Sequence, residues 1–134
     1  MTEPNYTKLR ILIVDDQEYM RKLVLQFLSK NEVVAIVGEA SSGDEAVQKA
    51  QEQHPDVILL DMSMPKTTGV EVARRIRSVI PDVRIYFFSA YDVDDFKNLV
   101  NSSPADGFIQ KSSLKSELNR MVQDELDRRK NKLT

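Results

Sequence analysis

Five short runs of nearly uninterrupted apolar residues recur along the chain. They span residues 9–14, 33–37, 57–60, 83–88 and 107–109. These runs lack the strict apolar–polar alternation of a strand that has one face in water. Such runs are typical of strands that are covered on both faces. The pattern therefore predicts a parallel β-sheet with helices on either side.

Longer amphipathic segments separate the runs and gather apolar residues on one helical face. The five apolar stripes are Met20, Leu23, Val24, Phe27 and Leu28; Ala46, Val47 and Ala50; Val72, Ala73, Ile76 and Ile80; Val93, Phe96, Leu99 and Val100; and Leu114, Leu118, Met121, Val122 and Leu126. The alternation of strands and helices predicts a single α/β domain with right-handed crossovers. We expect its core to span about residues 9–126, with a polar extension at 1–8 and a charged helix end at 127–134.

Length and composition narrow the possible classes of protein. The chain has 134 residues, which suits one domain, and no cysteine, which excludes disulfides and thiolate metal sites. Its 19 basic and 21 acidic residues give a net charge of −2, which argues against direct nucleic-acid binding. No apolar stretch approaches the roughly 20 residues of a membrane span. We therefore expect a cytoplasmic protein without a membrane partner.

Side chains that can carry chemistry follow four of the five predicted strands. Asp15 and Asp16 follow the first strand, Asp61 the third, Ser89 the fourth and Lys111 the fifth. Because ligands of an open parallel sheet bind beyond the carboxyl ends of its strands, we expect these side chains to converge. Three ionised carboxylates in one place repel each other and raise one another's pKa. A divalent cation removes this repulsion, so the sequence predicts a Mg²⁺ site.

The expected ligands are carboxylate oxygens of Asp16 and Asp61 and a main-chain carbonyl of the loop after Asp61. Asp15 would accept a hydrogen bond from a metal-bound water. Lys111 and the Ser89 hydroxyl would support the oxygens of an incoming phosphoryl group. A flavin cofactor is disfavoured, because two aspartates stand where a glycine-rich phosphate-binding loop would be needed.

Four segments, in their order along the chain, resemble the motifs of response-regulator receiver domains. They are Ile11-Leu12-Ile13-Val14-Asp15-Asp16, Asp61-Met62-Ser63-Met64-Pro65 with Gly69 behind it, Ser89-Ala90, and Lys111 after a short strand. The resemblance covers about residues 9–126, and each motif stands at a strand end. It implies a flavodoxin-like (βα)5 three-layer sandwich with a parallel five-stranded sheet in the order 2-1-3-4-5.

The resemblance also implies a role for each residue of the site. Asp61 matches the aspartate that accepts a phosphoryl group, and Lys111 matches the lysine of the family's site. Asp15 and Asp16 match the acidic pair that holds Mg²⁺ together with Asp61. The backbone carbonyl of Ser63 matches the remaining protein ligand. The implied reaction is in-line phosphoryl transfer from a histidine of a kinase or of a phosphotransfer protein.

Ser89 and Phe108 match the residues that switch in this family after phosphorylation. The implied change draws Ser89 toward the phosphoryl group, packs Phe108 inward and alters the surface of the fourth helix, fifth strand and fifth helix. An output partner is expected on that surface, as is a homodimer that depends on phosphorylation. The chain departs from the family at Ser112, where proline with a cis bond is common. The Lys111–Ser112 bond is therefore expected to be trans.

Two alternatives to a phosphorylated signalling domain stay open. One is a receiver-like module that acts by protein contact alone, and the other is the receiver fragment of a DNA-binding regulator. A phosphohydrolase is disfavoured, because such enzymes generally place a second acid two residues after the nucleophile, where this chain has Ser63 after Asp61. The chain is expected to catalyse only its own phosphotransfer and slow dephosphorylation. Asp16 is also expected to cap the helix that follows, and arginines 74, 75 and 77 to form a solvated face.

Overall fold

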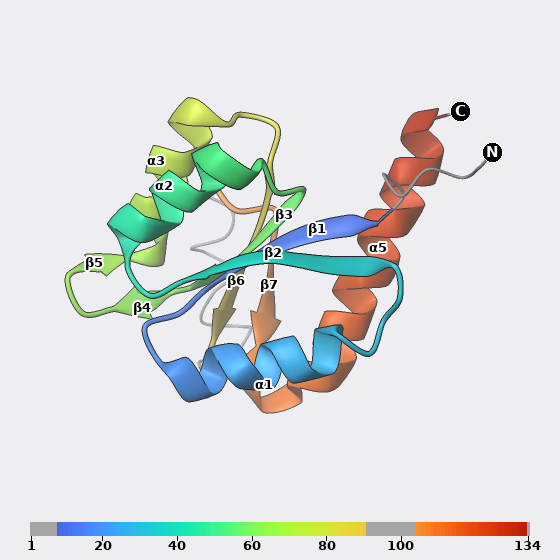
Figure 1. Ribbon diagram of the computed structural model, residues 1–134, viewed down its shortest axis with the longest axis horizontal. Helices are drawn as coiled ribbons and strands as arrows, with labels where there is room; N and C mark the ends of the chain where they lie inside the picture. The colour runs from blue at the N-terminus through green and yellow to red at the C-terminus, as the bar shows by residue number, and fades with distance from the viewer. Residues whose placement is uncertain (1–7, 91–103, 134) are drawn as a thin grey trace.

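The structure is a computed structural model that describes residues 8–90 and 104–133 of the chain. Within these residues, a central sheet lies between two layers of helices (Figure 1). The fourth predicted helix, with its stripe of Val93, Phe96, Leu99 and Val100, lies outside the described residues. In the part of the chain that is described, no helix combines the length and apolar character required to cross a membrane.

Five parallel strands form the central sheet in the spatial order β2-β1-β3-β6-β7. Their bounds are Leu9–Val14 for β1, Val34–Ala40 for β2, Val57–Asp61 for β3, Arg84–Ser89 for β6 and Gly107–Gln110 for β7. Counted within this sheet alone, the order is 2-1-3-4-5, so the predicted flavodoxin-like topology is confirmed. The apolar runs form its strands because helices cover both faces of the sheet.

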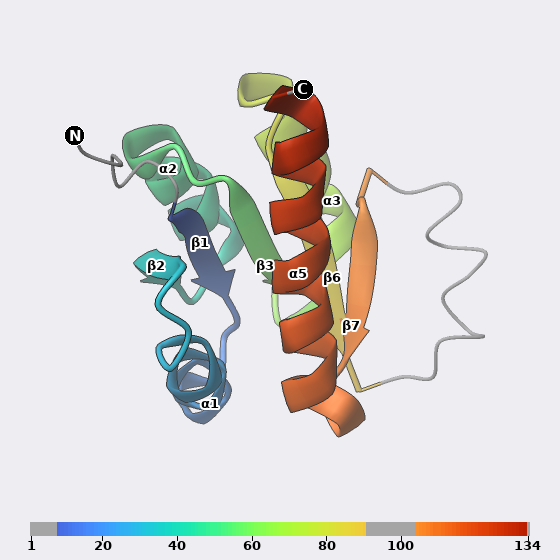
Figure 2. The same cartoon turned by 90° about the vertical axis from the view of Figure 1, so that its right-hand side faces the viewer.

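Helices α1 and α5 pack on one face of the sheet, and α2 and α3 pack on the other. Their bounds are Glu18–Leu28 for α1, Gly43–Gln53 for α2, Gly69–Val79 for α3 and Leu114–Leu133 for α5, which follows a short 3-10 turn at Lys111–Ser113. Figure 2 shows α5 running alongside the sheet from one end to the other. Successive strand residues face opposite sides, so Ile13 packs towards α1 and α5 and Leu12 towards α2 and α3.

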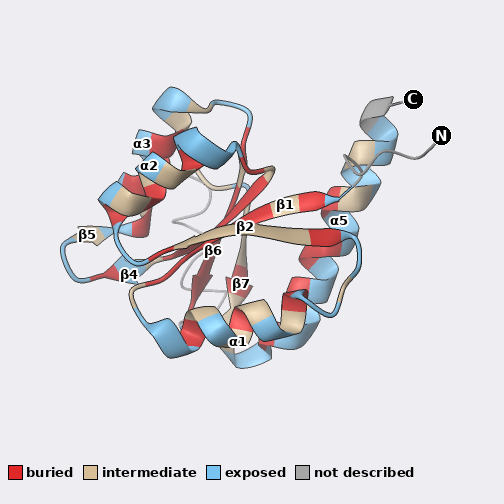
Figure 3. Ribbon diagram, viewed as in Figure 1, coloured by how far each residue is buried: buried red, intermediate tan, exposed pale blue. Residues whose placement is uncertain are grey.

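Two features of the strands differ from the sequence prediction. Strand β2 continues to Ala40, beyond the predicted end at residue 37. It is an edge strand and half-buried over most of its length (Figure 3), so its last residues need no apolar run. A small antiparallel hairpin, β4 at Ser63–Met64 and β5 at Thr67–Thr68, is absent from the prediction. Strands this short carry no detectable periodicity.

Arg77 corrects the expectation of a solvated arginine face. Arg74 and Arg75 are exposed, but the side chain of Arg77 is only 24% exposed. Its Nε donates to the carbonyl of Pro104 at 2.9 Å, and its Nη2 pairs with Asp106 Oδ2 at 2.5 Å. The carbonyl groups at this end of the sheet need donors, and the last turn of α3 lies close enough for Arg77 to supply them.

Candidate functional site

Three carboxylates meet at the carboxyl end of the sheet. Asp15 directly follows β1, Asp16 comes next, and Asp61 is the last residue of β3. One oxygen from each side chain lies within 4.8 Å of the other two. Asp15 and Asp61 are buried, with 0% and 5% of their surface exposed, and Asp16 is more exposed. The three acids converge because β1 and β3 are adjacent and parallel.

Lys111 brings a cation to two of these carboxylates. Its Nζ lies 3.4 Å from Asp15 Oδ2 and 3.5 Å from Asp61 Oδ1. The same nitrogen lies 5.0 Å from the centroid of the Phe88 ring, within the range of a cation–π contact. The Lys111–Ser112 bond is trans, as expected. One ammonium group therefore offsets part of the charge of three carboxylates.

The Asp61 carboxyl is strongly perturbed by this arrangement. Its burial, followed by repulsion from Asp15, raises the pKa of Asp61 to about 6. Lys111 and the backbone N–H of Ser63 lower this pKa, whereas Asp16 raises it further. The cluster thus carries more negative charge than Lys111 neutralises, and a bound cation would relieve the repulsion.

Strand β2, the β1–α1 loop and helix α1 each hold one polar atom of Asp15. The Asp15 N–H donates to the Ala40 carbonyl at 3.0 Å, and Asp15 Oδ1 accepts from the Gln17 N–H at 2.8 Å. The Asp15 carbonyl accepts from Arg21 Nη1 at 2.7 Å. The expectation that Asp16 caps α1 is wrong, because Gln17 is the N-cap residue. With no capping role, the Asp16 carboxylate joins the acidic cluster instead.

The loop between β3 and α3 holds Asp61. Asp61 Oδ1 accepts a hydrogen bond from the Ser63 N–H at 3.2 Å, and the Met62 carbonyl accepts from the Gly69 N–H at 2.9 Å. A Cβ atom on Gly69 would lie 2.7 Å from the Asp61 carbonyl oxygen, which is closer than side chains approach. Glycine at this position therefore lets α3 begin directly against the end of β3.

Ser89 lies on β6, the neighbour of β3, and Phe108 lies on β7, the neighbour of β6. Ser89 is the last residue of β6, is buried, and follows Phe88, the register partner of Asp61. It pairs in turn with Gln110 of β7, the residue before the turn that carries the site lysine. Phe108 is half-buried and packs against the apolar cluster under α2 and α3. Of the two predicted switch residues, Ser89 therefore lies at the same edge of the sheet as the acidic cluster, whereas Phe108 lies two strands away from Asp61.

The donor set of the cluster fits a small, hard cation. It consists of carboxylate oxygens, with no histidine or cysteine among the grouped residues. Mg²⁺ prefers oxygen ligands and usually keeps several waters. Because Asp16 is more exposed than Asp15 and Asp61, the cluster faces solvent on one side, where waters and a phosphoryl oxygen could complete the coordination.

A second charged cluster, which the sequence reasoning missed, lies at the start of β6. Glu125 of α5 is 3% exposed and accepts from Tyr86 Oη at 2.5 Å and from Arg84 Nε at 2.9 Å. Burial and the bond to Glu125 raise the pKa of the Tyr86 phenol. Arg84 Nη1 also pairs with Asp106 at 3.0 Å. The sequence contains one sign of this cluster: Glu125 lies on the apolar stripe of the last helix, three residues after Val122.

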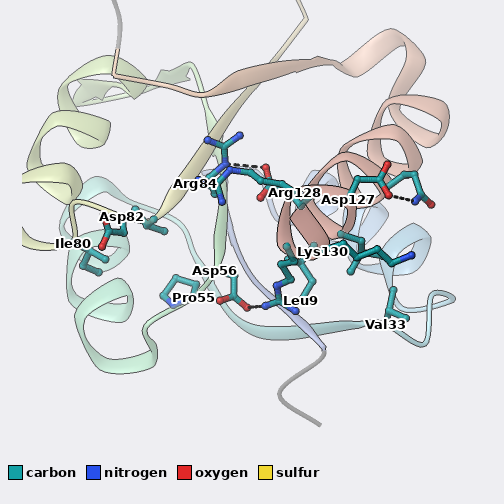
Figure 4. A pocket seen from close by; sticks show the side chains of 15 residues that line it. Leu9, Val33, Pro55, Asp56, Ile80, Asp82, Arg84, Asp127, Arg128 and Lys130 are labelled. Carbon is teal, nitrogen blue, oxygen red and sulfur yellow. Dashed lines mark hydrogen bonds and ion pairs between the residues drawn. The ribbon is translucent and has the colours of Figure 1, made fainter. Parts of the chain in front are cut away.

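A pocket of about 770 Å³ lies at the opposite end of the sheet from the acidic cluster (Figure 4). Leu9, at the start of β1, belongs to its apolar lining. Two ion pairs border the pocket, Arg84 with Glu125 at 2.9 Å and Arg129 with Asp56 at 2.7 Å. None of the clustered aspartates lines it, so the pocket is separate from the chemistry of that site.

Comparisons with known proteins agree with the fold. A family model described as "Response regulator receiver domain" matches residues 11–123. The response regulator GacA of Pseudomonas viridiflava is 31% identical over 105 residues, which cover 78% of this chain and 49% of that protein. The transcriptional regulatory protein DegU of Brevibacillus brevis is 33% identical over 107 residues, which cover 80% of this chain and 45% of that protein.

A solved structure leads to the same family. A two-component response regulator of the LuxR family from Aurantimonas sp. SI85-9A1 matches with a TM-score of 0.82 and 28% sequence identity, covering 90% of this chain and 86% of that chain. The chain belongs to the response-regulator receiver domain family. It spans about half the length of the curated relatives described above. Receiver domains interact with histidine kinases and with output domains.

Proposed function

We propose that Asp61 accepts the phosphoryl group in this receiver domain. The observation that carries the proposal is its position as a buried carboxylate at the end of β3, beside Asp15 and with Lys111 Nζ 3.5 Å away. A buried carboxylate among like charges costs stability, so its presence requires a functional reason. Acceptance of a phosphoryl group next to a bound cation supplies that reason.

In the proposed transfer, one Asp61 carboxylate oxygen attacks the phosphorus of a phosphohistidine in line with the leaving nitrogen. The new O–P bond forms as the N–P bond breaks. The electron pair of the broken bond stays on the imidazole nitrogen, which takes a proton from solvent. Lys111 offsets charge on the phosphoryl oxygens, and the Ser89 hydroxyl donates a hydrogen bond to one of them.

Mg²⁺ would be held by one carboxylate oxygen each from Asp16 and Asp61 and by the backbone carbonyl of Ser63. Asp15 would accept a hydrogen bond from a metal-bound water. When bound, the ion supplies the positive charge that offsets both the carboxylates and the incoming phosphoryl oxygens. The mutual distance of at most 4.8 Å among the acid oxygens supports this assignment.

The phosphorylated site would reach its partners through Ser89 and Phe108. Ser89 would move toward the phosphoryl group, and the half-buried Phe108 would pack further inward. We propose the surface of β7, α5 and the predicted fourth helix as the face for an output partner or for a phosphorylation-dependent homodimer. The expected donor is a cytoplasmic histidine kinase or phosphotransfer protein. Because the chain spans about half of its curated relatives, an attached DNA-binding domain is the alternative form of the output.

Phosphoramidate, a small donor with the same P–N bond, tests the assignment of Asp61. With Mg²⁺ present, intact-mass measurement should show one added phosphoryl group on the wild type and none on Asp61→Asn. Chelation of the metal with EDTA should abolish the labelling. Equal labelling of both proteins would contradict the assignment. No labelling of either, by phosphoramidate or by a kinase, would favour the module that acts by contact alone, and sustained turnover of a phosphomonoester would indicate a phosphohydrolase.

A further inference from the structure

We propose that Arg21 is a positioning residue for the acidic pair Asp15 and Asp16, and this inference rests on the proposed function of the cluster. Arg21 lies in α1, and its side chain is only 15% exposed. Its Nη1 donates to the carbonyl of Asp15 at 2.7 Å, and its Nε donates to Glu39 Oε1 at 3.2 Å. One guanidinium group thus joins the β1–α1 loop to strand β2.

The carbonyl that Arg21 binds belongs to the peptide unit between Asp15 and Asp16. Because a peptide unit is planar, fixing this oxygen also fixes the amide nitrogen and Cα of Asp16. The preceding peptide unit is fixed as well, since the Asp15 N–H donates to the Ala40 carbonyl at 3.0 Å. Rotation of the peptide between the two acids is then the main freedom left in the loop. The hydrogen bond from Arg21 removes it.

Glu39 explains how the positively charged Arg21 can position the two acids next to a site that is proposed to bind Mg²⁺. An arginine alone would repel a nearby Mg²⁺ ion. The ion pair with Glu39 balances the arginine charge. The backbone carbonyl of Glu39 accepts a hydrogen bond from Lys49, which ties this part of β2 to α2. The planar fork of arginine holds its two donors in a fixed geometry, which the ammonium group of lysine does not reproduce.

Removal of Arg21 distinguishes a positioning role from a purely electrostatic one. If the arginine positions the acids, its loss weakens Mg²⁺ binding even though a repelling positive charge disappears. If its charge is what matters, its loss tightens Mg²⁺ binding. The two roles therefore predict changes of opposite sign in the dissociation constant for Mg²⁺.

Isothermal titration calorimetry of the whole chain with Mg²⁺ measures this sign. Arg21→Met keeps much of the aliphatic stem and removes the donors, and its Kd should rise about tenfold, as for other hydrogen-bond partners of metal ligands. Lys22→Met is the matched control, because it removes a positive charge from the next position of the same helix. Lys22 is exposed and pairs with Glu18, so the Kd of Lys22→Met for Mg²⁺ should stay within about twofold of the wild-type value.

An Arg21→Met variant that binds Mg²⁺ as tightly as the wild type, or more tightly, overturns the inference. A wild type that does not bind Mg²⁺ overturns the proposed function of the cluster instead, so the two failures are distinguishable. Arg21→Lys should give an intermediate Kd, because it keeps the charge but loses the fork. Amide hydrogen exchange in EDTA gives a metal-free readout: exchange at Asp16 and Gln17 should be faster in Arg21→Met, and unchanged exchange contradicts positioning.

If Arg21→Met does not fold, Glu39→Gln provides the test in its place. Glutamine keeps an acceptor for Arg21 Nε but leaves the arginine charge unbalanced. The Kd for Mg²⁺ should rise, because the unbalanced guanidinium charge would repel the ion. An unchanged or lower Kd contradicts the proposed balance between Arg21 and Glu39.

Discussion

Replacing Asp61 with asparagine should stabilise the metal-free protein at neutral and alkaline pH. Burial and repulsion from Asp15 raise the pKa of Asp61 to about 6 in the fold, against an ordinary value of 3.8. The ionised side chain is therefore less stable in the folded chain than in the unfolded one. Asparagine keeps an oxygen for the Ser63 N–H, so the substitution removes the charge and little else.

The magnitude follows from the linkage between proton binding and folding. A pKa raised by about two units corresponds to about 3 kcal/mol of lost stability when the group is ionised. Because the folded chain binds this proton more tightly, the loss is complete above about pH 7 and disappears as the pH falls from about 6 to 4. Asp61→Asn should therefore raise the free energy of unfolding by up to about 3 kcal/mol at pH 8, and by about half of that at pH 5.

Urea unfolding in EDTA, followed by circular dichroism at pH 8 and pH 5, measures this difference. Asp82→Asn makes the same chemical change at an exposed position and should leave the free energy of unfolding unchanged. Added Mg²⁺ should stabilise the wild type more than Asp61→Asn, because the ion binds only to the intact cluster. A variant that is no more stable than the wild type at pH 8, or whose advantage is as large at pH 5, refutes the reasoning.

Three further substitutions test other parts of the structure. Gly69→Ala places a Cβ 2.7 Å from the Asp61 carbonyl oxygen and should cost about 1–3 kcal/mol in urea unfolding; a loss below about 0.5 kcal/mol would show that α3 can shift away. Glu125→Leu removes a buried carboxylate that two side chains share and should cost about 2–4 kcal/mol, whereas a neutral result would show that its partners reach water. Lys111→Met should raise the pKa of Asp61, since Lys111 lowers it, and should slow labelling by phosphoramidate. An unchanged pKa in an NMR titration would contradict the pairing at 3.5 Å.

The strands and the meeting of the acids could be predicted because both follow from rules that hold along the chain. Apolar runs mark strands that are covered on both faces, and parallel strands end at a common edge. This reasoning places Asp15, Asp61 and Lys111 together, and the structure brings them within ion-pair distance. The order of the strands could not be predicted in this way, because hydrophobic periodicity does not encode it. It came from the resemblance to a family.

The polar contacts of the helices could not be predicted. A charged residue looks the same in the sequence whether its side chain is solvated or bonded to another segment in the fold. Arg74 and Arg77 both lie on α3 outside its apolar stripe, yet Arg74 is exposed and Arg77 bonds to the end of the sheet. Arg21 likewise resembles any solvent-facing residue of α1 until β2 is placed beside it. Such contacts depend on the packing of segments that are distant in the sequence.

Helix α5 spans the distance between the two ends of the sheet as a single stiff rod. It begins at Leu114, just after the turn that contains Lys111, and its 20 residues make it about 30 Å long. A tilt of about 2° at its start would carry its far end about 1 Å. Two ion pairs tie the second half of this rod to the sheet, Glu125 with Arg84 at 2.9 Å and Arg129 with Asp56 at 2.7 Å. The two ion pairs therefore resist a tilt of the helix that begins at Lys111.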